Sequence, residues 1–417
     1  MSLNCPTEVG PTLRAEYLND RRPLNPARLQ AVVFALVCAA FVNIYITQPI
    51  LSVLEDEFHA STLQVSFSVS AVLLGIALAN LPFGWLADRW PVGRLILLGG
   101  TLIALAGLVC SWTDNLSVLI AARFVQGAFV PALTSCLAAH LARRLPKDSL
   151  NVAMGWYVAA TVLGGMLSRL LGGYVVPPAQ WRWAFSLAAI AVVIAVGLAW
   201  LELRNAPAPP RAQRDTVTFA ALLSQPALWL SYLCGAAGQA VFSPVFNYMP
   251  YRLAEKPFEL STQQTSLVYL VYLVGIVMGP GAGRIANRYG TGRTLIGGAL
   301  VLAVALLLLL VPSVTAVVIA LVLVCAGFFT VHAAAVGALN RKLTDGHGRA
   351  NAIYVLGYYL GAWFGITWAA WVYQHGGWSA LIGCAVLLVS VPLTAGLRER
   401  RAECRAPLAV TTASGVD

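Results

Sequence analysis

The sequence predicts an all-α polytopic membrane protein with twelve transmembrane helices in two pseudo-symmetric six-helix halves. The chain of 417 residues is 59% hydrophobic and only 11% charged, too little charge to cover a soluble domain of this size. Apolar runs of roughly 18–25 residues recur along it, each long enough to cross a hydrocarbon core of about 30 Å. A short charged motif also occurs twice, 199 positions apart, which indicates a duplicated half.

The apolar runs divide evenly between the two halves. In the N-terminal half, 30–201, they predict spans at 30–53, 65–87, 95–112, 117–139, 151–174 and 183–201. In the C-terminal half, 226–397, they predict spans at 226–250, 264–286, 294–311, 315–339, 351–373 and 379–397. The polar, proline-rich stretch 202–225 is expected to be a linker. Residues 1–29 and 398–417 are expected to be terminal tails.

The distribution of basic residues predicts the orientation in the membrane. Of the 27 Lys and Arg residues, 22 lie on the side of the termini and the linker, three on the other side and two inside spans. Because basic loops stay cytoplasmic, we expect both termini in the cytoplasm. The net charge of +10 is spread over many loops, so no nucleic-acid partner is expected. The eight cysteines are scattered without a CxxC pair, so we expect inert thiols and no metal site.

The duplicated motif lies in a basic loop after the second span of each half. The first copy reads Gly84-Trp85-Leu86-Ala87-Asp88-Arg89 and continues to Gly93-Arg94, and the second reads Gly283-Arg284-Ile285-Ala286-Asn287-Arg288 and continues to Gly292-Arg293. A carboxylate at a helix end can cap a neighbouring helix or pair with a basic residue. We expect a conformational latch built from Gly84, Asp88, Arg89, Arg94, Gly283, Arg288 and Arg293. Since Asn287 replaces the acid, the latch should be one-sided; the alternative is that these residues only anchor helix ends.

Three ionisable residues, Arg123, Arg169 and His332, fall inside predicted spans, whereas every Asp and Glu lies in a loop or at a span end. A charge at that depth costs about 2.5–3.5 kcal/mol, so each is a candidate for function. His332 could carry a coupled proton, because histidine titrates in the physiological range. A neutral histidine hydrogen-bonded within the bundle is the alternative.

Each embedded arginine also has a structural alternative. Arg123 shares a helix face with Gln126 and could tune a titrating group or hold substrate; alternatively, backbone carbonyls of adjacent helices satisfy it. Arg169 is flanked on one face by Gly165 and Gly172, which leave room for its guanidinium. Alternatively, it extends to the nearby membrane interface.

Several motifs resemble the major facilitator superfamily. Twelve spans with the G-x-L-A-D-R loop match its overall plan. Arg123-Phe124-Val125-Gln126-Gly127 resembles its R-x-x-Q-G pattern, and Gly164-x-x-x-Ser168-Arg169-x-x-Gly172-Gly173 resembles its antiporter motif with Ser for Gly and Arg for Pro. Tyr45-Ile46-Thr47-Gln48-Pro49-Ile50-Leu51 is similar to the Q-P-I-L segment of bacterial drug or sugar efflux permeases.

The resemblance implies a cavity lined by spans 1, 4, 7 and 10, which singles out Gln48, Arg123, Asn247 and His332. It further implies a secondary active transporter of the bacterial inner membrane that exports small organic compounds by alternating access. Such a protein is driven by a proton gradient and needs no other cofactor. Its partners would be a small-molecule substrate, protons and the lipid bilayer, and we expect a monomer.

Two other interpretations remain. The same scaffold could import an organic anion with Arg123 and Arg169 as its ligands. The lack of an embedded acid favours an anionic or neutral substrate over a cationic one, because a buried cation needs a counter-charge. A membrane-bound enzyme would need a nucleophile, a metal cluster or an acid pair. Only His140 near Arg143 and Arg144 comes close, and that cluster has the composition of a basic loop, so no enzymatic activity is expected.

Overall fold

The computed structural model describes residues 26–145, 147–204 and 217–405, and every regular element within them is helical. The prediction of an all-α membrane fold is therefore confirmed. Residues 1–25 and 406–417 of the predicted tails, and residues 205–216 of the predicted linker, lie outside the described residues.

The N-terminal half (N half) supplies six helical passes. The first pass is broken into α2 (Pro26–Val42), the 3₁₀ turn η1 (Gln48–Ile50) and α3 (Leu51–Phe58). The remaining elements are α4 (Thr62–Ala87), α5 (Val92–Trp112), α6 (Leu116–Leu133) with α7 (Ser135–Arg144), α8 (Lys147–Leu170) with the π-helical η2 (Leu171–Val175), η3 (Pro178–Gln180), and α9 (Arg182–Leu203).

The C-terminal half (C half) repeats this plan after the short helix α10 (Phe219–Leu223). Its elements are α11 (Pro226–Ala254), α12 (Thr262–Ser266) with η4 (Leu267–Tyr272) and α13 (Leu273–Tyr289), α14 (Thr291–Leu308), α15 (Val314–Arg341), α16 (His347–Leu388) and α17 (Ser390–Arg405). Within α16 the backbone turns at Gly377, which has a φ of 64° that glycine adopts without strain. One long element thus makes the eleventh pass and, with α17, the twelfth.

The twelve passes differ in length and in mean hydropathy. By length and mean hydropathy, eight helices of the described chain can cross a membrane, and a bent pair at Thr262–Met278 and Gly281–Tyr289 can form one more span. One of the eight, His347–Arg405, is 59 residues long and contains two passes. The first pass, Arg28–Val42, is a shorter apolar helix, and α11 is long but more polar. The arrangement is consistent with the twelve predicted spans.

The helices differ from the predicted spans at two places. The first span is interrupted at residues 43–47, where Pro49 lacks an N–H and its ring opposes the carbonyl four residues earlier. The last helix does not stop at 397 but continues to Arg405. Its charged end is held by protein contacts: Glu403 Oε1 accepts a hydrogen bond from the backbone N–H of Thr291 at 2.8 Å, and Glu399 pairs with Lys342.

Helices cross closely where glycines face one another. A Cβ placed on Gly127 of α6 would lie 2.0 Å from the carbonyl oxygen of Val72 in α4, and one on Gly75 would lie 2.4 Å from that of Phe124. Small residues at such crossings are how membrane helices gain van der Waals contact without a hydrophobic driving force. The second and fourth passes are therefore in backbone contact beside the arginine-bearing face of α6.

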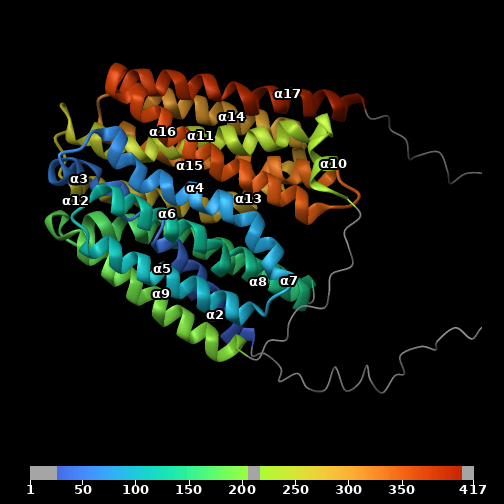
Figure 1. The fold of residues 1–417 in the computed structure, drawn as a ribbon. Helices are drawn as coiled ribbons and strands as arrows, with labels where there is room; N and C mark the ends of the chain where they lie inside the picture. The colour runs from blue at the N-terminus through green and yellow to red at the C-terminus, as the bar shows by residue number, and fades with distance from the viewer. Residues whose placement is uncertain (1–25, 146, 205–216, 406–417) are drawn as a thin grey trace, which may run out of the picture.

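The two halves join toward one end of the molecule. We call the end with residues 87–94, 141–145, 284–293 and 341–347 the basic face, and the end with α3, η3 and α12 the opposite face. The helices of the two halves lie together near the opposite face and spread apart toward the basic face (Figure 1).

Side-chain packing follows this spread. Toward the opposite face, Ala362 and Ile366 of α16 pack into the N-half core, and Val162 and Met166 of α8 pack into the C-half core. Near the basic face, the buried cluster around Leu339 consists of C-half residues.

The α4–α6 crossing generates a test of the packing. Gly127→Ala is expected to destabilise the protein by about 1–3 kcal/mol, because the added methyl group forces two backbones apart. Gly197→Ala in α9 is the matched control, since a Cβ there meets nothing within 4 Å. Thermal unfolding of the detergent-solubilised variants checks this. Equal unfolding midpoints for the two variants would contradict the close crossing.

Candidate functional site

The break in the first pass leaves backbone carbonyls without helical partners. Residues 43–47 form turns between α2 and η1. In a hydrocarbon core every such group must find a donor within the protein. The side chains that supply these donors define the centre of the N half.

Arg123 of α6 supplies two of the donors. Its side chain is fully buried; its Nη1 and Nη2 donate to the carbonyls of Asn43 and Ile44, and its Nε donates to the Ser68 carbonyl at 2.9 Å. Nη1 also donates to Gln126 Oε1 at 2.6 Å. Of the two interpretations open from the sequence, this geometry favours the structural one, because backbone carbonyls occupy most of the guanidinium's donors.

Gln126 extends the same network. Its Nε2 donates to Asn43 Oδ1 and to the Ile103 carbonyl, both at 3.3 Å. The Arg123–Gln126 pair therefore ties α6 to the broken first pass and to α5. The pair is buried and its hydrogen bonds are to N-half residues, so it holds the N half together.

The antiporter-like motif of α8 packs against the other side of the break. Ser168 Oγ accepts the Tyr45 N–H at 3.0 Å and donates to the Val42 carbonyl. A Cβ on Gly164 would lie 2.6 Å from the Cys38 carbonyl oxygen, and one on Gly172 would lie 2.2 Å from that of Ile46. Serine at this motif position thus satisfies the backbone that the break exposes, and the glycines allow the close approach.

Arg169, the next residue, stays inside the protein. Its side chain is 2% exposed, so extension to the interface does not occur. Its Nη1 donates to the Gly165 carbonyl at 2.6 Å, and its Nε donates to Gln48 Oε1 at 2.6 Å. A Cβ on Gly165 would lie 3.4 Å from Nη1, an ordinary van der Waals distance, so the guanidinium packs against this glycine without requiring it.

Aromatic rings complete the surroundings of Arg169. Its guanidinium carbon lies 3.9 Å from the ring centroid of Tyr45, 4.3 Å from that of Tyr272 and 5.2 Å from that of Tyr269. Rings at these distances attract a cation through their quadrupoles. Tyr45 belongs to the N half and the other two to η4, so Arg169 lies between the halves.

Gln48 and Asn247 meet at this junction. The two residues are 199 positions apart, the same offset as the duplicated loop, so they occupy equivalent places in the first pass of each half. Gln48 Nε2 donates to Asn247 Oδ1 at 3.4 Å, and both side chains are fully buried. Asn247 Nδ2 has no hydrogen-bond partner. The structure brings together Gln48, Asn247 and Arg169 from the predicted set.

Nearer the opposite face, two further contacts that sequence reasoning missed join the halves. Tyr248 Oη lies 3.0 Å from Ser66 Oγ and donates to the Ile366 carbonyl at 2.8 Å. Tyr251 Oη donates to Glu55 Oε1 at 2.9 Å. The sequence signal for these contacts was the pair of tyrosines, Tyr248 and Tyr251, that follows Asn247. We call these two contacts, with the Gln48–Asn247 pair, the junction.

His332 lies in a separate cluster within the C half. Its Nδ1 is 2.9 Å from Tyr354 Oη, and its ring centroid lies 5.1 Å from that of Tyr358 and 6.0 Å from that of Phe328. These partners come from α15 and α16. The structure therefore does not bring His332 to Gln48 or Arg169. His332 instead has a hydrogen-bond partner within the bundle, as the alternative of a neutral histidine expects.

Asp88 at the basic face is paired within its own half. Arg143 of α7 donates from Nη1 to Asp88 Oδ1 at 2.9 Å and from Nη2 to the Ala87 carbonyl at 2.8 Å. Arg89 stacks on the Trp85 ring at 3.7 Å. In this conformation the predicted latch residue thus links the second pass to the fourth, and both members of the ion pair belong to the N half.

The second copy of the motif lacks this ion pair. Lys342 is 199 positions after Arg143, and with Asn287 in place of the acid it pairs with Glu399 instead. Arg288 lies 5.3 Å from the Tyr289 ring. Four predicted latch residues remain. A Cβ on Gly84 or Gly283 would face open space, and the side chains of Arg94 and Arg293 are exposed.

The later glycines of the two copies make tight contacts that were not predicted. A Cβ on Gly93 would lie 2.6 Å from the Leu203 carbonyl oxygen, and one on Gly292 would lie 2.4 Å from the Arg400 nitrogen. Each therefore lets the third pass of its half start against the end of the sixth. Their occurrence at the same place in both copies was the available signal.

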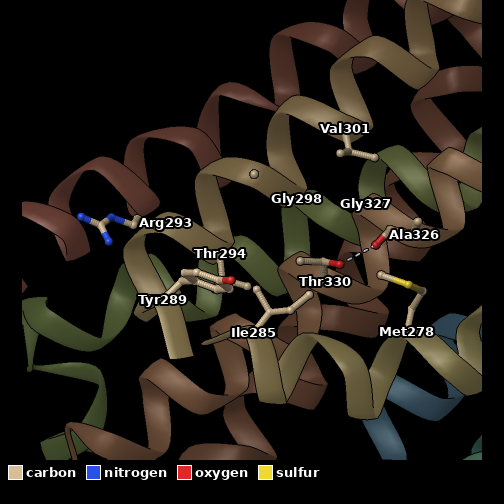
Figure 2. A pocket seen from close by; sticks show the side chains of 11 residues that line it. Met278, Ile285, Tyr289, Arg293, Thr294, Gly298, Val301, Ala326, Gly327 and Thr330 are labelled. Atoms are coloured by element: carbon tan, nitrogen blue, oxygen red, sulfur yellow. Dashed lines mark hydrogen bonds between the residues drawn. The ribbon is translucent and has the colours of Figure 1, made fainter. Parts of the chain in front are cut away.

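A groove of about 480 Å³ lies elsewhere, among α13, α14 and α15, with Arg293 at one end and Met278 at the other (Figure 2). Its lining is nearly all apolar and contains none of the junction residues. Within the described parts of the chain, no three His, Cys, Asp or Glu side chains are grouped to hold a metal ion.

Comparisons with known proteins agree with this architecture. The family model described as Major Facilitator Superfamily matches residues 33–331 and 228–408. The inner membrane transport protein YnfM of Escherichia coli (strain K12) is 26% identical over 90% of this chain and 91% of its own. The MFS-type transporter YybF of Bacillus subtilis (strain 168), itself uncharacterized, is 24% identical over 87% and 91%.

Solved structures share the fold at low sequence identity. A bacterial homolog of the human lysosomal transporter Spinster, in an inward-facing and occupied conformation, superposes with a TM-score of 0.72 at 14% identity, covering 95% of this chain and 100% of that one. The human organic anion transporter MFSD10 gives 0.68 at 15%, covering 89% and 99%. The chain therefore belongs to the major facilitator superfamily, a family of membrane transporters and not of enzymes.

Proposed function

We propose that this protein is a secondary active transporter that exports small organic compounds from a bacterial cell in exchange for protons. It acts as a monomer in the inner membrane by alternating access. The observation that carries the proposal is the junction: polar contacts from the first pass of each half join the halves toward the opposite face, while the halves spread toward the basic face. With the basic face in the cytoplasm, this is an inward-facing state.

The relatives support this assignment. YnfM is named an inner membrane transport protein, and the Spinster homolog was solved in an inward-facing conformation. Broken helices near the membrane midplane are a recurrent feature of secondary transporters. The break at residues 43–47 is such a feature.

The junction is weak enough to open during transport. A hydrogen bond contributes only about 0.5–1.5 kcal/mol net, and the Gln48–Asn247 contact at 3.4 Å is a long one. Packed seams between α4 and α16 and between α8 and η4 supply the surface on which the halves can rock. Alternation of this kind would open the opposite face and bring the basic-face ends together.

Asp88 would act when the basic-face ends of the two halves come together. Here it is exposed and bonded to Arg143 of its own half, the arrangement expected of a released latch. When the basic face closes, we propose that Asp88 and its neighbouring arginines engage the C half. The Asn287 copy would contribute no charge, so the latch is one-sided.

A second candidate, import of an organic anion, is favoured by one observation. Arg169 is buried between the halves, and its hydrogen bonds and ring contacts are to neutral groups. The structural neighbour MFSD10 is named an organic anion transporter. The direction of transport separates the two candidates.

A growth screen tests export. Expression in a bacterial strain stripped of its own exporters is expected to protect against some members of a panel of cationic, neutral and anionic toxic compounds. Asp88→Asn should reach the membrane in equal amount but reduce protection at least about tenfold, equivalent to roughly 1.4 kcal/mol. The matched control, Asn287→Ala in the second copy, should retain it.

Full protection by Asp88→Asn would contradict the latch. If the wild-type protein protects against nothing but accumulates organic anions in uptake assays, import replaces export as its function.

His332 generates a separate prediction about proton coupling. His332→Gln should make transport into proteoliposomes insensitive to an imposed pH gradient, because glutamine keeps a hydrogen-bonding side chain but cannot titrate. Tyr354→Phe removes only the partner of His332 Nδ1 and should preserve the gradient dependence. An unchanged pH profile in His332→Gln would exclude this residue as the proton carrier.

A further inference from the structure

We propose that Arg169, Asn247 and Tyr272 form a binding site for an oxyanion, so that the transported compound carries a carboxylate, sulfonate or phosphate group. The inference rests on the proposed transport function and specifies its substrate class. The site lies between the halves, beside the break in the first pass.

Arg169 carries a positive charge inside the protein. Arg169 is 2% exposed, and its guanidinium contacts an amide oxygen, a backbone carbonyl and three tyrosine rings. None of these neutralises a positive charge. A buried charge without a counter-ion is costly, and membrane proteins keep one chiefly where function requires it. An anion bound at Arg169 would supply the missing charge.

Two buried hydrogen-bond donors near Arg169 have no partner among the described residues. Asn247 Nδ2 and Tyr272 Oη are buried and have no hydrogen-bond partner; their residues are 0% and 6% exposed. Buried polar groups are satisfied in most structures, so such groups need an explanation. Tyr272 lies over the guanidinium, and Asn247 bonds to Gln48, which accepts from Arg169. An oxyanion offers the several acceptors that these groups lack.

The side chains of the proposed site come from both halves of the protein. Arg169 and Gln48 belong to the N half, and Asn247 and Tyr272 belong to the C half. An anion held by all of them would contact both halves, which is how a substrate at the repeat interface can couple its binding to the movement of the halves.

Tyr45 is the side chain that would move to admit the anion. Its ring is half-buried and lies 3.9 Å from the guanidinium carbon. It belongs to the non-helical residues 43–47, whose backbone is held by Arg123 and Ser168, so the ring and not the backbone would move. Displacement of Tyr45 would replace one ring contact on Arg169 by the oxyanion.

Arg123 does not share this role. Two backbone carbonyls at the break, the Ser68 carbonyl and Gln126 occupy its guanidinium. The two embedded arginines are therefore distinguished by their partners: one holds the fold, and the other is available to a ligand.

The test is a thermal-unfolding titration of the purified full-length protein in lipid nanodiscs. The probes are benzoate, benzenesulfonate and phenyl phosphate, with octyl phosphate as a lipid-like anion and with benzamide and benzylamine as neutral and cationic controls. At least one anion should raise the midpoint in a saturable manner, and the two controls should not. A response to octyl phosphate alone would identify a lipid-like substrate.

Variants connect the response to the site. Arg169→Gln should weaken the anion response about 10- to 100-fold, the range expected for losing a charged hydrogen bond. Arg28→Gln removes the same charge from an exposed position and should respond like the wild type. Asn247→Asp, nearly the same shape, places a carboxylate beside Gln48 and Arg169 and should abolish the response even if Arg169→Gln fails to fold.

Three results would overturn the site: no response to any anion, an equal response to benzamide, or a response unchanged in the folded variants. Failure of the site and failure of the transport proposal are distinguishable. Protection against neutral or cationic compounds without an anion response would remove only the site. An anion response without any transport would remove only the transport function.

Discussion

The structure depends on satisfying the backbone that is exposed where the first membrane pass is broken. A gap in a helix at membrane depth frees carbonyls that lipid cannot solvate. Arg123 donates to the carbonyls of Asn43 and Ile44, and Ser168 donates to that of Val42. Two side chains from different helices therefore make the broken conformation possible. Removing either one would leave buried carbonyls unpaired, at a cost of about 1–3 kcal/mol each.

The rest of the candidate site follows from this break. The α8 helix must approach the first pass closely to deliver Ser168, and that approach places Arg169 beside Gln48. Gln48 in turn reaches Asn247, its counterpart in the C half, where the corresponding helix α11 is continuous. The duplicated halves are thus asymmetric at their contact: one contributes a broken helix and a cation, the other an unbroken helix and aromatic rings.

The sequence was sufficient to predict the fold, because apolar length and the 199-residue offset are local or periodic signals. It also identified Arg123 and Arg169 as exceptional. It could not assign their roles, since the carbonyls that occupy Arg123 lie 55 to 80 positions away and two of the three rings around Arg169 come from the other half. The Gln48–Asn247 contact could have been predicted, because these two residues are 199 positions apart, like the two copies of the duplicated loop.

A reversible cross-link across the junction measures whether the opposite face must open during transport. In a background without native cysteines, Glu55→Cys and Tyr251→Cys replace two residues whose side chains are 2.9 Å apart here. Bridging them with a short bis-methanethiosulfonate reagent should stop transport, and reduction should restore it, because the opposite face must open in every cycle. Continued transport with the bridge in place would contradict alternating access at this junction.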